Sequence, residues 1–378
     1  MKIKILIPYA SYGNGHRAIA EYIKNYFEKD SPKYEVVTLD LLVYSIPVIG
    51  ELSKKFSTAL MLRYPLLWSV IYNFFNNRVS SSVYKSVGIT LFKNKKLTKF
   101  IKEFNPNLTI STHFFGSNLI AYYNKKSICN SKLITVITDY EAHEIWIKNN
   151  NNEDAIVVGN KEEVSLIVKR GIDRNKIKAF GIPIAPIIPS DFNKEKALRK
   201  YGFLGIRPVC LFFAGGSDGN KAVLPYLKKV LDSKLNIDFL FISGSNKYVK
   251  KKALELVEEN NANNIRIFGF VTNVPELFEL CDFVITKPGG AQSTEALYFK
   301  KPAIMINSSG GQEKANMKYF VKNGYGKKFS FPFTFIKYLN KVSKNPDILS
   351  EMQNNLNKNT NNEAMKKLFD LANEIIKK

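Results

Sequence analysis

The residues best suited to chemistry lie in the stretch 286–297, whose sequence is Thr-Lys-Pro-Gly-Gly-Ala-Gln-Ser-Thr-Glu-Ala-Leu. The apolar run 282–286 predicts a buried strand and the residues after the glycines a helix, so these glycines fall at a strand-to-helix turn. Backbone amides at such a turn, with the positive end of the helix dipole, favour an anion such as phosphate. A carboxylate repels phosphate, so Glu295 is better suited to accept hydrogen bonds from sugar hydroxyls. The stretch predicts a nucleotide-sugar site, with a tight turn and a surface glutamate as the alternative.

A second glycine turn, residues 11–16, follows the apolar run 3–9 and precedes a helical pattern. Its Gly-x-Gly-x-x-Ala spacing, together with Asp40 at the end of the next predicted strand, imitates a dinucleotide-binding fingerprint. An NAD(P)-dependent oxidoreductase is therefore a rival interpretation, although Asp40 lies 27 residues after Gly13, beyond the usual distance of about 20. Neither glycine turn continues into Gly-Lys-Ser/Thr, which excludes a P-loop.

His16 is the unusual residue of this turn, because a bound pyrophosphate does not require an imidazole there. A histidine at the mouth of a cleft is suited to take a proton from a sugar or lipid hydroxyl, since its ordinary pKa is close to working pH. His16 is therefore the first candidate for a general base, and the alternative is a histidine that caps its own helix. Asp139 and His143, in the stretch 138–146 after another predicted strand, are candidates for base, base-orienting group or acceptor ligand, or for an ordinary capped loop.

The remaining polar residues predict contacts to a sugar and not metal ligands. Gln312 and Glu313 follow a further predicted strand and suit paired hydrogen bonds to sugar hydroxyls. The three cysteines lie far apart in or beside apolar runs, and the three histidines lack the spacing of a zinc motif. An Asp-x-Asp metal motif is also absent from the sequence. We expect no metal and no cofactor.

Residues 51–102 interrupt the alternation of predicted strands and helices. They hold ten Lys or Arg against one acid, Glu51, with nine interleaved Phe, Tyr and Trp. Their longest stretch without charge, 64–77, has 14 residues and is too short to span a bilayer, which needs roughly 20. Basic residues among aromatic ones favour a surface that lies in the membrane interface. The alternative is an amphipathic insert that packs on the core with a solvated basic face.

The formal net charge of +23 favours anionic partners: nucleic acid, acidic membrane or phosphorylated substrates. The excess is spread evenly, with +11 on residues 1–185 and +12 on the remainder, so it indicates no single patch. A nucleic-acid-binding protein would explain the charge but not glycine turns at strand ends, and we expect no nucleic-acid partner. The opening residues pass directly into a strand, with no signal peptide visible, and we expect a cytoplasmic protein.

The length of 378 residues and the order of elements predict two domains. Strands predicted near 3–9, 34–40, 108–112, 133–138, 155–158 and 177–180 precede a proline-rich connector, and strands near 209–214, 238–243, 265–270, 282–286 and 303–306 follow it. We expect an α/β protein of two Rossmann-like, doubly wound domains that face a cleft. The predicted parts are 1–184, 185–345 and a helical segment 346–378 that packs back on the first domain, with one helix from 357 to 378.

These motifs resemble those of glycosyltransferase family 28, in the group of the bacterial processive diacylglycerol glucosyltransferases and the plant monogalactosyldiacylglycerol synthases. The peptidoglycan enzyme that adds N-acetylglucosamine to lipid I is a more distant relative. The resemblance covers nearly the whole chain and rests on five motifs in the family's order. They are the opening 10–16, the stretch 136–146, Gly-Phe-Val-Thr-Asn at 269–273, the stretch 286–297 and Gly-Gln-Glu-Lys-Ala-Asn at 311–316.

The resemblance implies a GT-B fold, inverting transfer without a metal, and a UDP-sugar as donor substrate. Glycine turns would meet the diphosphate, a backbone segment the uracil edge, Glu295 the ribose, and a Gln-Glu pair the donor sugar. The phosphate turn, Pro-Gly-Gly-Ala-Gln-Ser, lies where relatives vary in sequence. The donor-binding residues that carry over are Gly215, Gly216, Ser217, Gly269, Phe270, Val271, Pro288, Gly289, Gly290, Ser293, Thr294, Glu295, Gln312 and Glu313.

The resemblance also implies a lipid acceptor and peripheral attachment to the inner face of the cell membrane, with an anionic membrane surface as partner. We expect a hexose, glucose in preference to galactose, to pass from UDP to diacylglycerol, with several sugars added in turn. A UDP-N-acetylglucosamine-dependent enzyme acting on another lipid-linked acceptor is the alternative. His16, Asp139 and His143 are the catalytic candidates. The acceptor and membrane candidates are Gly15, Trp68, Trp146, Lys95 and Lys96.

Overall fold

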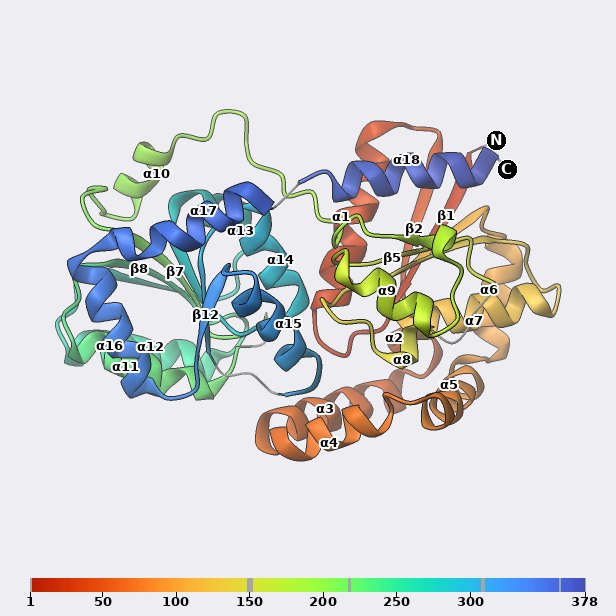
Figure 1. The fold of residues 1–378 in the computed structure, drawn as a ribbon, viewed down its shortest axis with the longest axis horizontal. Helices are drawn as coiled ribbons and strands as arrows, with labels where there is room; N and C mark the ends of the chain where they lie inside the picture. The colour runs from red at the N-terminus through yellow and green to blue at the C-terminus, as the bar shows by residue number, and fades with distance from the viewer. Residues whose placement is uncertain (1, 148–151, 217–218, 307–309, 360–361, 378) are drawn as a thin grey trace. The chain divides into compact units, whose positions relative to one another are not determined.

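The computed structural model describes residues 2–147, 152–216, 219–306, 310–359 and 362–377. Contacts divide the chain into two compact units, each shown in Figure 1 with its own sheet. Unit 1 comprises Met1–Ala185, Ser309–Gln312 and Asn362–Lys378, and unit 2 comprises Pro186–Ser308 and Glu313–Asn361. The chain passes from unit 1 to unit 2 inside the proline-containing connector.

Unit 1 contains the strands β1 (Ile3–Tyr9), β2 (Tyr34–Asp40), β3 (Leu108–Ser111), β4 (Lys132–Val136), β5 (Ala155–Val157) and β6 (Ile177–Lys178). They form one parallel sheet in the order β2-β1-β3-β4-β5-β6. After β1 the chain adds β2 on one side of the sheet, and after β3 it adds β4, β5 and β6 on the other side. The switch point therefore lies between β1 and β3, and in such sheets ligands bind at the carboxyl ends of the strands that flank it.

The helices of unit 1 cover this sheet and add a helical insert between β2 and β3. Apolar residues of α2, α6 and α7 pack together against the sheet, with Leu6 and Leu133 from the strands among them. The helices are α1 (Gly15–Asp30), α2 (Leu41–Ser45), α3 (Pro47–Arg63), α4 (Pro65–Phe74), α5 (Arg78–Phe92), α6 (Lys95–Phe104), α7 (Phe114–Lys125), α8 (Glu144–Ile147), α9 (Glu162–Lys169) and α18 (Ala364–Lys377), with a 3-10 turn at Arg174–Lys176.

The C-terminal helix α18 packs on unit 1 through one aromatic cluster. The ring of Phe369 lies 4.9 Å from Phe27 and 5.6 Å from Tyr26, between ring centroids. The hydroxyl of Tyr34 also donates a hydrogen bond to Asn373. The single helix expected from 357 to 378 is wrong, because α17 (Ser350–Asn359) ends before α18 begins and groups with unit 2.

Unit 2 contains the strands β7 (Val209–Phe213), β8 (Asp238–Ile242), β9 (Ile265–Phe268), β10 (Phe283–Thr286), β11 (Ala303–Ile306) and β12 (Gly326–Phe329). They form a parallel sheet in the order β12-β11-β10-β7-β8-β9. The switch point lies between the neighbours β7 and β10. Together the two sheets confirm the predicted pair of doubly wound α/β domains, although β12, of which the sequence is Gly-Lys-Lys-Phe, was not predicted.

Helices of unit 2 enclose a core of Phe, Leu and Ile side chains from the strands and from α11 and α16. They are α10 (Lys194–Lys200), α11 (Leu224–Asp232), α12 (Lys247–Glu259), α13 (Val274–Leu280), α14 (Gly290–Tyr298), α15 (Gly311–Lys322), α16 (Pro332–Lys344) and α17, with 3-10 turns at Lys221–Val223 and Pro346–Leu349. The first two residues of α15 group with unit 1 and the remainder with unit 2.

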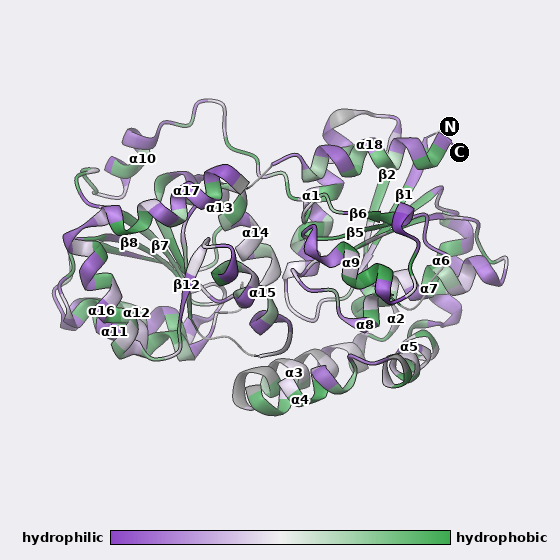
Figure 2. Ribbon diagram, in the orientation of Figure 1, coloured by the Kyte–Doolittle hydropathy of each residue, from purple (hydrophilic) through white to green (hydrophobic). Residues whose placement is uncertain are grey.

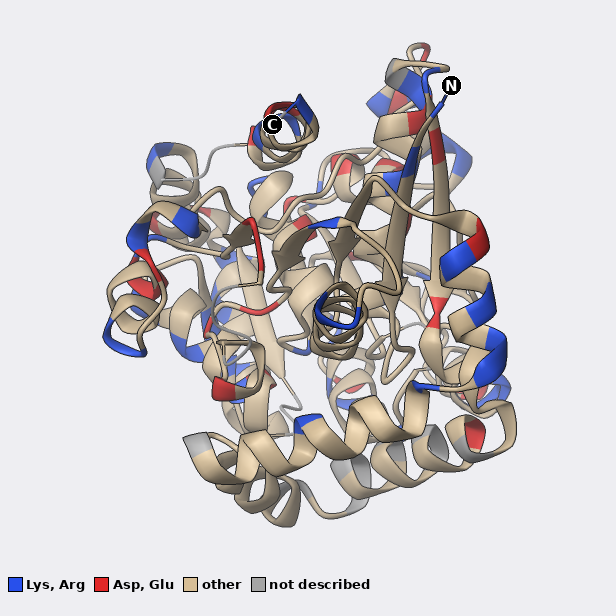
Figure 3. Ribbon diagram, turned by 90° about the vertical axis from the view of Figure 1, so that its right-hand side faces the viewer, with Lys and Arg blue, Asp and Glu red and all other residues tan. Residues whose placement is uncertain are grey.

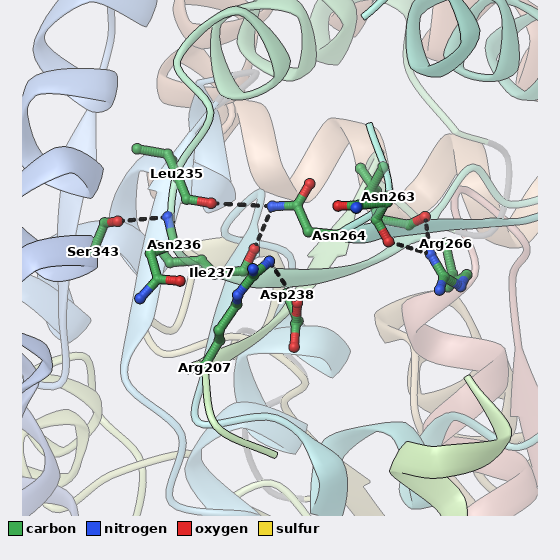
Figure 4. A network of polar contacts seen from close by, with 10 residues as sticks. Arg207, Leu235, Asn236, Ile237, Asp238, Asn263, Asn264, Arg266 and Ser343 are labelled. Atoms are coloured by element: carbon green, nitrogen blue, oxygen red, sulfur yellow. Dashed lines mark hydrogen bonds and ion pairs between the residues drawn. The ribbon is translucent and has the colours of Figure 1, made fainter. Parts of the chain in front are cut away.

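The amino ends of β8 and β9 are joined by a polar network (Figure 4). The side-chain amide of Asn264 donates to the carbonyl oxygens of Leu235 at 3.1 Å and Ile237 at 2.6 Å. The backbone amide of Asn236 donates to Ser343 on α16 at 2.7 Å. These hydrogen bonds connect the amino ends of β8 and β9 to each other and to α16, and so stabilise this end of the sheet.

Candidate active site

His16 lies in the first turn of α1, directly after β1 and therefore beside the switch point of unit 1. Its Nδ1 is 2.8 Å from the carbonyl oxygen of Thr112 and 2.9 Å from the hydroxyl of Thr138. A carbonyl oxygen can only accept, so in the neutral ring Nδ1 carries the proton and Nε2 holds the lone pair. Burial lowers the pKa of His16 to about 4, which keeps the ring neutral and able to accept a proton. Its helix is entered through Gly13, whose φ of +95° suits glycine.

His113 joins this site, although the sequence predicted no catalytic role for it. It follows β3, and its ring centroid lies 4.6 Å from that of His16 in an edge-to-face arrangement. Its Nδ1 accepts a hydrogen bond from the backbone amide of Phe115 and so caps α7. Burial, and then the neighbouring His16, lower the pKa of His113 well below its ordinary value. Its position after a predicted strand was the available signal.

His143 is held by hydrogen bonds at both ring nitrogens. Its Nδ1 accepts from the backbone amide of Ile145 at 3.1 Å, and its Nε2 donates to the carbonyl oxygen of Tyr72 at 2.8 Å. The ring of Tyr72 lies 4.3 Å away between centroids. The next backbone amide, of Glu144, donates to the side chain of Asn76. The loop after β4 is therefore fastened to the end of α4, and burial lowers the pKa of His143 to about 4.

The other candidates of unit 1 lie around these histidines. Asp139 is half-buried next to Thr138, whose hydroxyl contacts His16. Trp146 is buried, with its ring centroid 6.2 Å from His16 and 6.1 Å from His113. Gly15 is the first residue of α1. The carboxyl ends of β1, β3 and β4 thus bring together imidazoles, a carboxylate and an indole.

In unit 2 the predicted phosphate turns follow β7 and β10, the two strands at the switch point. The side chain of Gln292 joins them, because it donates to the carbonyl oxygen of Gly215 at 3.2 Å and accepts from the hydroxyl of Thr286 at 3.1 Å. Gly215 has a φ of +123°, which only glycine adopts easily. A side chain at Gly216 or Gly289 would meet no protein atom within 4 Å, so both turns leave open space beside the backbone. Ser217 lies outside the described residues.

A positively charged side chain, that of Lys287, lies at the same edge of the sheet. The ammonium group of Lys287 lies 2.8 Å from a carboxylate oxygen of Glu313 on α15. The side-chain amide of Asn316 donates to the carbonyl oxygen of Pro288 at 3.1 Å. These two contacts fix the 287–290 turn against α15, with the amides of α14 beginning at Gly290. Of the predicted sugar-binding pair, Glu313 groups with unit 2 and Gln312 with unit 1.

Of the four predicted donor residues within α14, Ser293, Thr294 and Glu295 are buried and Gly290 is half-buried. Glu295 lies one turn into the helix with 8% of its surface exposed. The hydroxyl of Thr294 donates to the carbonyl oxygen of Gly290 within the helix. The hydroxyl of Ser293 is buried and has no hydrogen-bond partner among the described residues. Gly269, Phe270 and Val271 follow β9, where the ring of Phe270 is exposed.

The insert exposes apolar side chains on three helices and lysines on a fourth. Large apolar side chains are exposed along α3, α4 and α5, and green predominates along α4 in Figure 2. Lys95 and Lys96 are instead exposed on α6, whose opposite face buries Leu97 and Ile101. Figure 3 shows where Lys and Arg (blue) and Asp and Glu (red) lie along the ribbon. Trp68 on α4 is half-buried. The exposed apolar residues are Val48, Leu52, Phe56, Leu66, Leu67, Val70, Phe74, Val79, Val83, Val87 and Leu91.

Neither a metal-binding cluster nor a membrane-spanning helix occurs in the described part of the chain. His, Cys, Asp and Glu side chains form no group of three or more that could hold a metal ion there. The helices described are all too short or too polar to cross a bilayer.

Two family models match the chain. Residues 16–184 match the monogalactosyldiacylglycerol (MGDG) synthase model, and residues 210–368 match the glycosyltransferase family 28 C-terminal domain. Among curated proteins, the processive diacylglycerol beta-glucosyltransferase of Bacillus pumilus is 31% identical over 328 residues, which are 85% of this chain and 82% of that protein. The enzyme of the same name from Staphylococcus saprophyticus is 26% identical over 355 residues, 93% of this chain and 88% of that protein.

Solved structures share the fold at low sequence identity. MurG of Acinetobacter baumannii is 11% identical with a TM-score of 0.63, over 98% of this chain and 99% of that one. HepE of Anabaena in complex with UDP-glucose is 14% identical with a TM-score of 0.54, over 98% of this chain and 100% of that one. Likenesses at such identities bear on the fold alone, and they confirm the predicted GT-B class.

Proposed function

The chain belongs to glycosyltransferase family 28, in the group of the diacylglycerol glucosyltransferases and monogalactosyldiacylglycerol synthases, and we propose that it transfers glucose from UDP-glucose to diacylglycerol. The observation that carries this proposal is the match to a processive diacylglycerol glucosyltransferase at 31% identity over 85% of the chain. The enzyme is a UDP-sugar-dependent hexosyltransferase. Transfer of further glucoses to the first product is the processive activity that the names of these relatives describe.

The reaction is a single displacement at the anomeric carbon. The lipid hydroxyl attacks from the face opposite UDP, a new carbon–oxygen bond forms, and the bond to the diphosphate oxygen breaks with its electron pair leaving on UDP. Nε2 of His16 takes the hydroxyl proton, because Nδ1 already donates to the Thr112 carbonyl. In the free enzyme its pKa of about 4 makes it a weak base, and the negative charge of a bound donor would raise that pKa.

His143 has a supporting role in this mechanism. Both of its nitrogens are engaged, with Ile145 and Tyr72, so it has no free lone pair for a substrate proton. We propose that His143 holds in place the loop that carries Asp139. Asp139 then stabilises the imidazolium or orients the acceptor hydroxyl.

The departure of UDP is assisted by unit 2. In this proposal the amides at the start of α14 and the ammonium group of Lys287 stabilise the negative charge that develops on the diphosphate. Gly216 leaves room for that group at the neighbouring strand end. Glu295 accepts hydrogen bonds from the ribose. In this proposal the chain itself supplies the positive charge, with no metal or other cofactor.

We further propose that the enzyme attaches peripherally to the cytoplasmic leaflet through α3, α4 and α5. Leu66 is 83% exposed and Val48 is 72% exposed, and monomeric proteins rarely leave such apolar surface in water. Lysines such as Lys95 and Lys96 on the adjoining α6 favour anionic headgroups. This arrangement would bring a diacylglycerol hydroxyl to the enzyme without extraction of the acyl chains.

The test is transfer from UDP-glucose and, separately, UDP-galactose to diacylglycerol in liposomes that contain anionic lipid. We expect glucolipid from UDP-glucose, with a ladder of products, and UDP binding at least tenfold weaker in Glu295→Ala, since removing a partner of the ribose hydroxyls leaves them unpaired. Exposed Glu258→Ala is the matched control for a lost carboxylate. Absence of glycolipid with either donor would overturn the acceptor, and normal UDP binding by Glu295→Ala would overturn the ribose assignment.

A further inference from the structure

Residues 314–346 of unit 2 form a basic segment that the proposed function does not explain. They contain eight lysines and no aspartate or glutamate, whereas about three acids would be expected from the 33 in the whole chain. The segment runs through most of α15, the edge strand β12 and α16. It therefore carries charge of one sign only, as residues 52–102 of unit 1 also do.

Two phenylalanines stand exposed at the centre of this segment. Phe331 is 69% exposed and Phe333 is 72% exposed, on either side of Pro332 in the turn from β12 to α16. In the same segment Phe320 and Phe335 are fully buried in the core, so the exposed pair is not required for packing. The turn is fixed, because Pro332 begins α16 and the hydroxyl of Thr334 donates to the carbonyl oxygen of Phe331 at 3.0 Å.

Lysines flank these rings on both elements that meet at the turn. Lys327 and Lys328 are exposed on β12, and Lys337 and Lys341 are exposed on α16. Lysine on an edge strand also prevents pairing with another chain, and this reason would account for Lys327 and Lys328 alone. It does not account for two apolar rings in water beside them.

We propose that residues 327–334 form a second membrane-contact site, in which Phe331 and Phe333 enter the interface of an anionic bilayer and Lys327 and Lys328 pair with phosphate headgroups. Aromatic rings favour the interface, and each lysine near an anionic surface adds attraction. The site belongs to unit 2, whereas the α3–α5 surface belongs to unit 1. Two contacts on one chain bind with a high effective concentration, so the donor-binding unit would stay at the lipid surface between successive transfers.

The experiment is cosedimentation with vesicles of phosphatidylglycerol and phosphatidylcholine, without nucleotide or diacylglycerol. We expect F331S/F333S to bind about tenfold more weakly than the parent protein, from the loss of two buried rings. The matched control is L204S/I206S, since Leu204 and Ile206 are each 81% exposed on the same unit; it should bind within about twofold of the parent. Equal binding by F331S/F333S and the parent, or an equal loss in the control, would overturn the site.

The charge component is tested with K327Q/K328Q. We expect it to bind phosphatidylglycerol-containing vesicles several-fold more weakly and to match the parent protein on phosphatidylcholine alone. Displacement of the vesicles by duplex DNA that binds more tightly would assign the surface to nucleic acid instead. Because the assay needs no turnover, this result is independent of the transfer assay: a parent protein that forms no glycolipid but shows this binding pattern would refute only the proposed function.

Discussion

The two units place different chemistry at the same topological position, a strand-to-helix turn beside the switch point. In unit 1 the turn from β1 to α1 holds a neutral imidazole, whose Nδ1 lies against the Thr112 carbonyl in an aromatic setting. In unit 2 the turn from β10 to α14 holds open backbone at Gly289 and a cation, Lys287. Every histidine of the chain lies in unit 1. In the proposed function the same turn therefore serves proton transfer in unit 1, where His16 follows the glycines, and anion stabilisation in unit 2, where Lys287 precedes them.

Replacement of His16 tests whether the turn of unit 1 supplies the general base. His16→Asn keeps a side-chain N–H close to Nδ1 for the Thr112 carbonyl but removes the Nε2 lone pair, so kcat should fall by roughly 10²- to 10⁴-fold. UDP affinity should stay unchanged, because the proposed contacts to the ribose and the diphosphate lie on the other unit. Initial rates in liposomes and calorimetric titration with UDP measure the two quantities. A variant that retains full kcat would remove His16 from the proton transfer.

The pH dependence of kcat/KM tests the protonation state of His16. Burial holds the pKa of His16 at about 4, so the base is already neutral far below pH 6.5. With the parent protein, kcat/KM should stay level from pH 8 to about 5 and fall only as the pH approaches 4. A midpoint near 6.5 would mean that the free enzyme holds His16 in an ordinary, solvated state.

The sequence alone predicted the two sheets well because buried parallel strands are short apolar runs between turn residues. β12 was missed since it is an edge strand whose two lysines face solvent. The glycine turns and His16 were found because each directly follows such a strand. The role of Tyr72 and the locked state of His143 could not be foreseen, because their contact joins residues 71 positions apart and depends on how the insert packs.

The pH dependence of stability tests whether His143 is a buried, structural histidine. The pKa of His143 is about 4 in the folded protein against 6.5 when unfolded, so only the unfolded state gains its proton as pH falls through that window. The parent protein should therefore lose roughly 3 kcal/mol of stability relative to His143→Gln between pH 7 and pH 4. Glu153 and Glu163, whose pKa values burial raises to about 6 and about 7, oppose the histidines but remain in both proteins and cancel in the difference. Urea unfolding at several pH values measures it, and a pH-independent difference would refute the locked neutral ring.

Replacement of Gly289 in the unit 2 turn distinguishes a role in the fold from a role in ligand binding. Its φ of −76° suits any residue, and a methyl group there would meet no protein atom within 4 Å. Gly289→Ala should therefore leave the melting temperature within about 1 °C of the parent, since neither strain nor overlap arises. The methyl group would nevertheless occupy space that the proposal gives to the diphosphate, so UDP should bind about tenfold more weakly. Gly205→Ala is the contrasting control, because its φ of +72° lies where alanine is strained, and it should lower the melting temperature without weakening UDP binding. Unchanged UDP affinity in Gly289→Ala would place the phosphates elsewhere and leave the unit 2 turn without the role that distinguishes it from the turn at His16.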